Sequence, residues 1–278
     1  MARSWWVVAM FSNFMINAWI SGTIIALLVG AVGFFVVMRG AAFAAHAIPN
    51  GAFAGAAGAN LVGLNPLLGL VSFALFAALG IGASSRWAKS DVATALALVT
   101  MLALGAAFLA TSNDYEPAIN ALLFGEILGV SSSEILPVIL LAVVCGLGLT
   151  LLFRPLLYSS LSLELSRANG LNTTVIEVFF LVVMALASAL AVPVVGALLT
   201  FSLMIGPPAA ARLLSSQPRW SLILSMVLSL LTLWTSIASS YSFNLPIGFF
   251  VGTLSALTYL VVRAWVVVSA RNARVAIA

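Results

Sequence analysis

The sequence predicts an all-α, polytopic transmembrane helical bundle, and three observations support that prediction. Of its 278 residues, 63% are hydrophobic and only 6% are charged, whereas a soluble domain carries roughly 25% charged residues. The mean hydropathy of +1.22 indicates that lipid, rather than water, covers most of the surface. The apolar runs are continuous over about 20 residues, the length that a spanning helix needs. They also lack the period-two alternation of a membrane-spanning strand.

Polar residues and Pro/Gly-rich breaks divide the chain into a series of expected spans. In order, these lie near residues 16–38, 41–62, 66–86, 92–112, 134–153, 173–191, 194–211, 219–241 and 245–268. The segment 194–211 contains Gly196 and the triplet Gly206-Pro207-Pro208, which predict a short or broken helix. We therefore expect about eight or nine spans in a single transmembrane domain over residues 1–278, without a fixed-period repeat.

Basic residues follow alternate spans, which predicts the orientation of the chain. After the first, third, fifth, seventh and last spans come Arg39, Arg86, Lys89, Arg154, Arg167, Arg212, Arg219, Arg263, Arg271 and Arg274. Cytoplasmic loops carry an excess of Lys and Arg. The opposite side holds Arg3 as its one basic residue, so we expect an outside N-terminus and a cytoplasmic C-terminus. The net charge of +4 arises from these dispersed topology signals and does not indicate a nucleic-acid partner.

The single histidine lies in the second expected span, one helical turn before an asparagine. His46 and Asn50 are four residues apart, so their side chains share one face of a helix. A polar pair inside an apolar span is costly unless it meets a partner or a water-filled path. Neutral imidazole binds zinc and other transition metals well, and an amide oxygen is a weaker ligand. The pair predicts a transient metal contact; the alternative is that His46 packs between helices and bonds a backbone carbonyl.

Other residues within the spans predict packing rather than chemistry. Gly51 and Gly55 form a small-xxx-small face that allows close approach of another helix. Glu177 lies one turn inside the sixth span and needs a partner, for which a cytoplasmic arginine is the candidate. Cys145 is the only cysteine, which excludes a disulfide or a thiolate cluster within the chain.

Two connections on the predicted cytoplasmic side could dock a partner. Residues 154–174 include a helical stretch over 163–168, which the following Asn169-Gly170 should end. Residues 206–220 include a Pro-Pro pair that is expected to open a short alanine-rich helix over 209–214. The alternative is that both segments are plain connections. On the outer side, residues 119–128 are expected to form a short interfacial helix.

The motifs of soluble catalysis are missing from the sequence. No G-x-x-x-x-G-K-[ST] loop occurs and Lys89 is the only lysine, so the chain cannot hydrolyse ATP by that route. No His/Cys cluster, G-x-S-x-G elbow or dinucleotide fingerprint occurs either. An enzyme is therefore disfavoured against a protein that passes a solute. A stand-alone secondary transporter or channel for small cations is the alternative, but it would usually carry more intramembrane acids than Glu126 and Glu177.

Three stretches of the sequence resemble the permease subunits of the metal-ion ABC transporters of the zinc, manganese and iron type. The first comprises residues 30–39 (GAVGFFVVMR) and 43–55, and the second is 163–170 (LELSRANG). The third and most specific comprises 194–199 (VVGALL) and 205–214 (IGPPAAARLL). The resemblance extends from about Ser21 to Arg263, most of the chain.

The resemblance implies an importer subunit in a bacterial plasma (inner) membrane. Two permease chains, expected to be identical, would form the pore within the lipid. Two cytoplasmic ATPase subunits would bind ATP, and an extracytoplasmic metal-binding protein would deliver the ion, so no cofactor is expected in this chain. Coupling to the ATPase would run through the segment near 205–220 and the helix near 164. The residues so assigned are Gly206, Pro207, Ala211, Arg212, Glu164 and Arg167.

The sequence departs from the family pattern at the expected metal contact. The family commonly carries Asp and His at the places of His46 and Asn50, where the pair is thought to contact the passing metal. Here the spacing is kept, but a carboxylate is lost. The expected cargo is a divalent metal ion, zinc or manganese, and a site without a carboxylate favours zinc.

Overall fold

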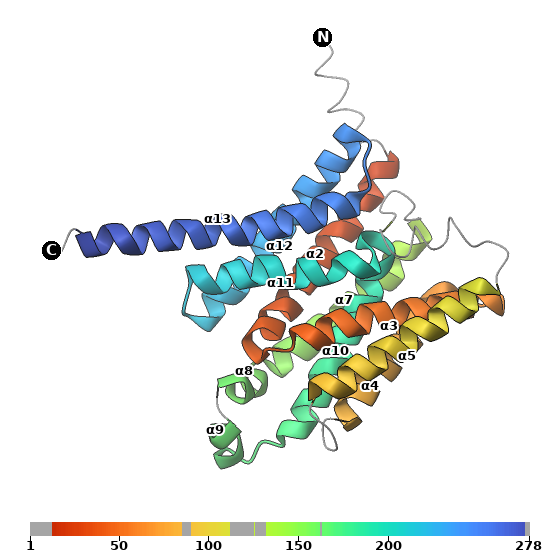
Figure 1. Cartoon of the computed structure of the whole chain (residues 1–278), viewed down its shortest axis with the longest axis horizontal. Coiled ribbons are helices and arrows are strands. Elements are labelled where there is room, and N and C mark those ends of the chain that lie inside the picture. Colours follow the sequence, from red (N-terminus) through yellow and green to blue (C-terminus); the bar gives the residue numbers. More distant parts are fainter. Residues whose placement is uncertain (1–12, 85–89, 112–124, 126–131, 162, 276–278) are drawn as a thin grey trace, which may run out of the picture.

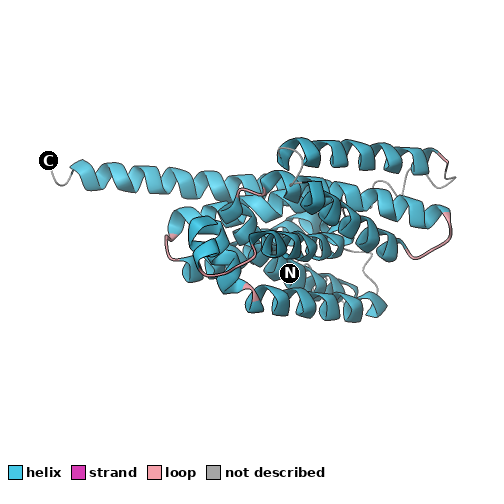
Figure 2. Cartoon of the chain, turned by 90° about the horizontal axis from the view of Figure 1, so that it is seen from below, coloured by secondary structure: helices cyan, strands magenta, loops and turns pink. Residues whose placement is uncertain are grey.

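The computed structural model describes residues 13–84, 90–111, 125, 132–161 and 163–275. Every regular element within these residues is a helix, which confirms the all-α prediction (Figure 2). In chain order the helices are α2 Asn13–Arg39, α3 Ala42–Leu61, α4 Pro66–Ser84, α5 Ser90–Ala110, α7 Ser132–Leu151, α8 Phe153–Leu161, α9 Leu163–Ala168, α10 Thr173–Val195, α11 Ala197–Leu214, α12 Pro218–Phe243 and α13 Ile247–Val275. Apart from Gly125, the interfacial helix expected at 119–128 lies outside the described residues.

Fewer helices qualify as membrane spans than the sequence predicted. By length and apolar composition, 5 of the described helices could cross a membrane: Met15–Arg39, Pro66–Ala83, Thr173–Val195, Pro218–Phe243 and Ile247–Ala270. The count rises to 6 if α7 and α8, which meet at a 58° bend, form one span. The expected eight or nine spans are therefore not confirmed. The apolar parts of α5 and α11 are short, and α3 contains polar and small residues that lower its hydropathy.

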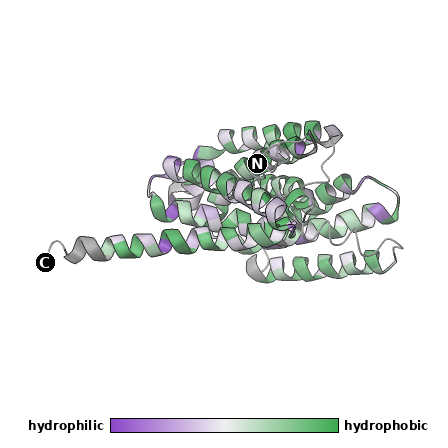
Figure 3. Cartoon of the chain, turned by 90° about the horizontal axis from the view of Figure 1, so that it is seen from above, coloured by the Kyte–Doolittle hydropathy of each residue, from purple (hydrophilic) through white to green (hydrophobic). Residues whose placement is uncertain are grey.

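Helix α2 runs through the middle of the bundle (Figure 1). It contacts α7, α10, α11 and α12, and its Phe34 and Phe35 are fully buried. Helices α3, α4 and α5 pack together beside it. Outward-facing side chains are largely apolar, as a lipid-facing surface requires; Phe76 is 65% exposed and Leu151 80% exposed. Figure 3 accordingly shows few strongly hydrophilic positions along the helices.

Glycine allows α3 and α4 to approach closely. A Cβ added to Gly55 would collide with the carbonyl oxygen of Gly69, and one added to Gly69 would collide with that of Gly55. The two backbones are thus in direct contact, which only a residue without a side chain permits. The packing role predicted for Gly55 is confirmed.

The boundary between α10 and α11 differs from the expected one. Helix α10 continues through Pro193 to Val195 and ends at Gly196, whose φ of 95° suits glycine. Helix α11 then runs without interruption through Pro207 and Pro208 to Leu214. The expectation that the Pro-Pro pair opens a separate short helix is therefore wrong.

Helix α2 packs closely against α11 at its prolines. Pro208 has no N–H to donate to the carbonyl of Met204, four residues earlier. Gly33 of α2 packs directly against this carbonyl and against the ring of Pro208. A side chain at Gly33 would collide with this carbonyl, so a residue without one allows α2 to pack against the proline turn of α11.

The short helices α8 and α9 lie at one end of the bundle (Figure 1). Helix α9 covers Leu163–Ala168 and is followed by Gly170 with φ of 69°, which confirms both the helix and its glycine stop. Helix α8 is tied to the end of α2, because Arg39 Nη1 donates a hydrogen bond to Ser159 Oγ at 2.6 Å.

Candidate functional site

His46 lies on α3 where that helix meets α11. Its ring packs edge-on against Phe201, with 5.0 Å between ring centroids and an interplanar angle of 74°. The side chain is half-buried, and its Nδ1 is buried without a hydrogen-bond partner among the described residues. A buried, unpaired imidazole nitrogen is energetically unfavourable unless something binds it. The alternative for His46 is that it packs between helices and bonds a backbone carbonyl; Nδ1 makes no such bond to a described residue.

Asn50 is more deeply buried, with 2% of its surface exposed. Its Nδ2 donates a hydrogen bond to the His46 carbonyl oxygen at 2.7 Å, across one turn of α3. The amide nitrogen is therefore engaged with the backbone, and the amide oxygen is the atom that Asn50 can offer to a metal. Helical spacing places His46 and Asn50 on one face of α3, as expected. The Asn50 amide nitrogen, however, bonds the His46 backbone and not its imidazole ring.

A charged cluster lies near the start of α3. A pocket of about 130 Å³ is lined by Arg39 of α2, Glu177 of α10, Ala44 of α3 and Thr94 of α5, with other residues. Glu177 interacts electrostatically with Arg39, so the expectation that Glu177 meets an arginine is confirmed. The Arg39 guanidinium also lies 5.4 Å from the centroid of the Phe180 ring, a cation–π contact. Ala44, which lines this pocket, belongs to α3, the helix that carries His46.

Sequence reasoning did not assign Arg39, Phe180 or Phe201 to the site. Arg39 ends a hydrophobic span, so its position was sufficiently explained as a topology signal. The two phenylalanines belong to apolar runs in which nothing distinguishes a residue that contacts the site from a lipid-facing one. Their role depends on helix packing, which a single sequence does not encode locally.

The residues predicted to couple to an ATPase lie in different environments. Pro207 and Ala211 are buried inside the bundle. Gly206 faces α13, since a Cβ there would lie 2.6 Å from the carbonyl oxygen of Ser255. Arg212 is half-buried near the end of α11, while Glu164 is exposed on α9. The backbone of Arg167 lies in α9, but its side chain is outside the described part of the structure.

Within the described residues, no group of three or more His, Cys, Asp and Glu side chains gathers to hold a metal ion. His46 and Asn50 together offer two ligand atoms of different strength. This arrangement suits a contact made in passing better than a closed structural site, which takes about four ligands.

The fold is that of a helical membrane protein with several candidate spans. The model described as the ABC 3 transport family matches residues 11–266, and the chain belongs to that family. This confirms the family resemblance found in the sequence.

Individual relatives give a finer comparison. The chain is 30% identical over 251 residues to the manganese import system permease protein ScaB of Streptococcus parasanguinis, covering 90% of this chain and 89% of that protein. It is 26% identical over 231 residues to the high-affinity zinc uptake system membrane protein ZnuB of Buchnera aphidicola, covering 82% and 88%. The solved structure of PsaBC from Streptococcus pneumoniae in complex with Fab matches with a TM-score of 0.84 and 25% identity, covering 93% of this chain and 94% of that one.

Proposed function

We propose that the chain is the membrane-spanning permease subunit of an ATP-driven importer for divalent metal ions, with zinc and manganese as the candidate cargoes. The observation that carries the proposal is the likeness over nearly the whole length to permeases named for manganese and zinc. These relatives are components of transport systems. An enzyme or a stand-alone cation transporter is therefore not favoured.

In this proposal the ion passes His46 on its way through the subunit. The unpaired, buried Nδ1 supplies a ligand atom, and Asn50 supplies a weaker oxygen ligand one turn away. A site with imidazole and without a carboxylate favours zinc over manganese. Several relatives are named for manganese, which points the other way. Measuring which metal is transported would show whether the local ligands or the overall similarity predicts the cargo better.

The proposed partners are cytoplasmic ATPase subunits, an extracytoplasmic metal-binding protein and a second permease chain. The exposed Glu164 on α9 and the half-buried Arg212 at the end of α11 support an ATPase surface at that end of the bundle. Helix α13 extends beyond the other helices (Figure 1), and only 11% of its most apolar stretch is buried. Such an apolar face suits a second copy of the chain or lipid. Positive residues support a cytoplasmic C-terminus.

Reconstitution into liposomes tests the function. The chain is incorporated with its ATPase, the binding protein is added outside, and uptake of zinc and of manganese is measured with and without ATP. ATP-dependent uptake of either metal is the expected result. Uptake by the chain alone, without ATP, would contradict the proposal and restore the stand-alone transporter.

A further inference from the structure

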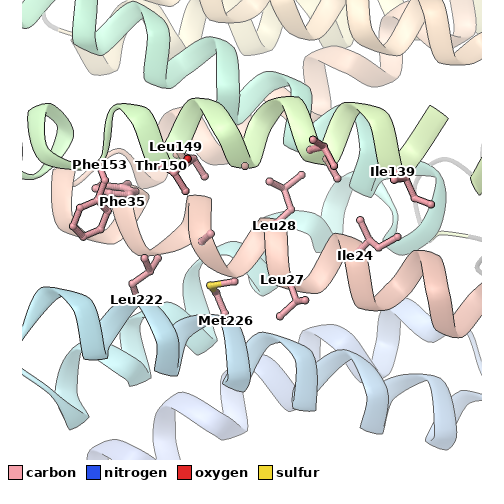
Figure 4. A pocket seen from close by; sticks show the side chains of 14 residues that line it. Ile24, Leu27, Leu28, Phe35, Ile139, Leu149, Thr150, Phe153, Leu222 and Met226 are labelled. Carbon is pink, nitrogen blue, oxygen red and sulfur yellow. The ribbon is translucent and has the colours of Figure 1, made fainter. Parts of the chain in front are cut away.

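An apolar groove of about 540 Å³ lies between α2, α7 and α12, away from His46 (Figure 4). Helix α7 contributes Ile139 and Leu149, α2 contributes Leu28, and α12 contributes Leu222. Thr150 is the one polar side chain among the described residues that line the groove, and its hydroxyl already bonds the Leu147 carbonyl at 2.9 Å. The groove therefore offers a hydrocarbon surface to whatever occupies it.

The length and the lining of the groove suit an acyl chain. From Ile139 to Thr150 it extends about 16 Å at the helical rise of about 1.5 Å per residue, which matches one leaflet of a hydrocarbon layer about 30 Å thick. Apart from Thr150 its lining is apolar, as a hydrocarbon chain requires.

A basic pocket adjoins the end of the groove at the α7–α8 bend. This pocket, of about 580 Å³, is lined by Phe153, Arg154, Leu157, Tyr158, Gln217, Pro218 and Arg219. Phe153 lines both the groove and the basic pocket, so the two are neighbours. Arg154 and Arg219 are exposed, and neither forms an ion pair with a carboxylate among the described side chains. Two exposed cations from different helices thus lie beside one end of the apolar groove.

We propose that the groove and the basic pocket together bind one anionic phospholipid. The acyl chains lie along α2 between α7 and α12, and the phosphate lies between Arg154 and Arg219. Guanidinium groups form short, charge-assisted hydrogen bonds with phosphate oxygens. Tyr158 and Gln217 add neutral hydrogen-bonding groups to the same pocket. The bound lipid connects α8 to the start of α12, and the proposal does not depend on which ion the chain transports.

Native mass spectrometry of the purified full-length chain, in the assembly in which it is isolated, tests the lipid site. The probes are phosphatidylglycerol and phosphatidylcholine with identical acyl chains. We expect the unaltered chain to retain phosphatidylglycerol preferentially. Each basic residue near an anionic membrane surface increases the affinity for it about five-fold. The double variant Arg154→Gln with Arg219→Gln should therefore bind phosphatidylglycerol roughly thirty-fold more weakly. Phosphatidylcholine carries the same phosphate next to a cationic choline and is neutral overall, so its binding should fall much less and the preference for phosphatidylglycerol should be lost. Arg263→Gln, an exposed arginine of α13 outside the groove, is the matched control.

The acyl-chain half of the site has its own pair of variants. Gly146 lines the groove, and a Cβ added there meets nothing within 4 Å, as is also true of Gly80 on α4. Gly146→Leu should fill the groove and weaken the binding of both lipids. Gly80→Leu should leave the binding of both unchanged. Equal loss in the two glycine variants would overturn the acyl-chain assignment. Unchanged phosphatidylglycerol binding in the double arginine variant would overturn the headgroup assignment, and concurrent loss of ATPase attachment would assign the arginines to that partner.

Discussion

Replacement of His46 by phenylalanine separates a ligand role from a packing role. The substitution keeps an aromatic ring against Phe201, where the two rings now lie 5.0 Å apart, and removes the nitrogen that lacks a partner. We expect the His46→Phe variant to assemble normally and to lose metal uptake. His46→Ala should also lose uptake, but it sacrifices the ring contact as well.

The expected stability changes follow from two opposing terms. An aromatic pair contributes about 0.5–1.5 kcal/mol beyond the area that it buries, and His46→Ala loses this. An unsatisfied buried polar atom is unfavourable by about 1–3 kcal/mol, and both substitutions relieve it. Alanine also loses the area that the ring buries against its neighbours, so it should be the less stable variant, whereas phenylalanine keeps the ring contact and relieves the unpaired nitrogen. His46→Phe should therefore melt no lower than the unaltered chain.

Two measurements check this prediction. Thermal unfolding in detergent reports the stability, and ATP-dependent uptake in liposomes reports the transport. Asn60→Ala, an exposed amide farther along α3, is the control and should preserve both. If His46→Phe transports zinc and manganese normally, the imidazole is a packing residue and the proposed route does not pass it. If His46→Phe unfolds at a much lower temperature, the substitution removes a stabilising bond, and the assumption that Nδ1 is unpaired is wrong.

Three further substitutions test other contacts. Gly33→Leu should destabilise the chain by about 1–3 kcal/mol through overpacking against the Met204 carbonyl. Gly80→Leu, in open space, should not. Equal melting temperatures of the two variants would refute the close contact at Gly33. Arg39→Gln should lower the melting temperature, since a charged hydrogen bond contributes about 1.5–3 kcal/mol, and an unchanged value would contradict the described cluster. Arg212→Glu should weaken co-purification of the ATPase, and an unaffected complex would move the docking surface elsewhere.

The family and the helical class could be predicted from the sequence because both depend on local patterns. Continuous apolar runs give helices in lipid regardless of their neighbours. The spacing of His46 and Asn50 fixes a shared face through helix geometry alone. The stop at Gly170 likewise follows from one residue that adopts a positive φ without strain.

The details that escaped prediction depend on contacts between distant segments. Pro207 and Pro208 ordinarily interrupt or begin a helix, and their local preference predicted a new helix there. In the structure α11 continues through both prolines and packs there against Gly33 of α2, which lies far away in the sequence. Local propensity is a weak preference that such tertiary packing overrides.

Arg39 shows how the same limit applies to function. In the sequence it is one basic residue at the end of a span, sufficiently explained by topology. In the structure it bonds Ser159 of α8, interacts with Glu177 of α10 and lines a pocket with Ala44, two residues before His46. A single guanidinium thus joins α2 to α8 and α10 beside a pocket that α3 also lines. Because α8 adjoins α9, the ATPase in the proposed function would act on helices that Arg39 bonds directly, and Arg39→Gln should then also reduce ATP-dependent uptake.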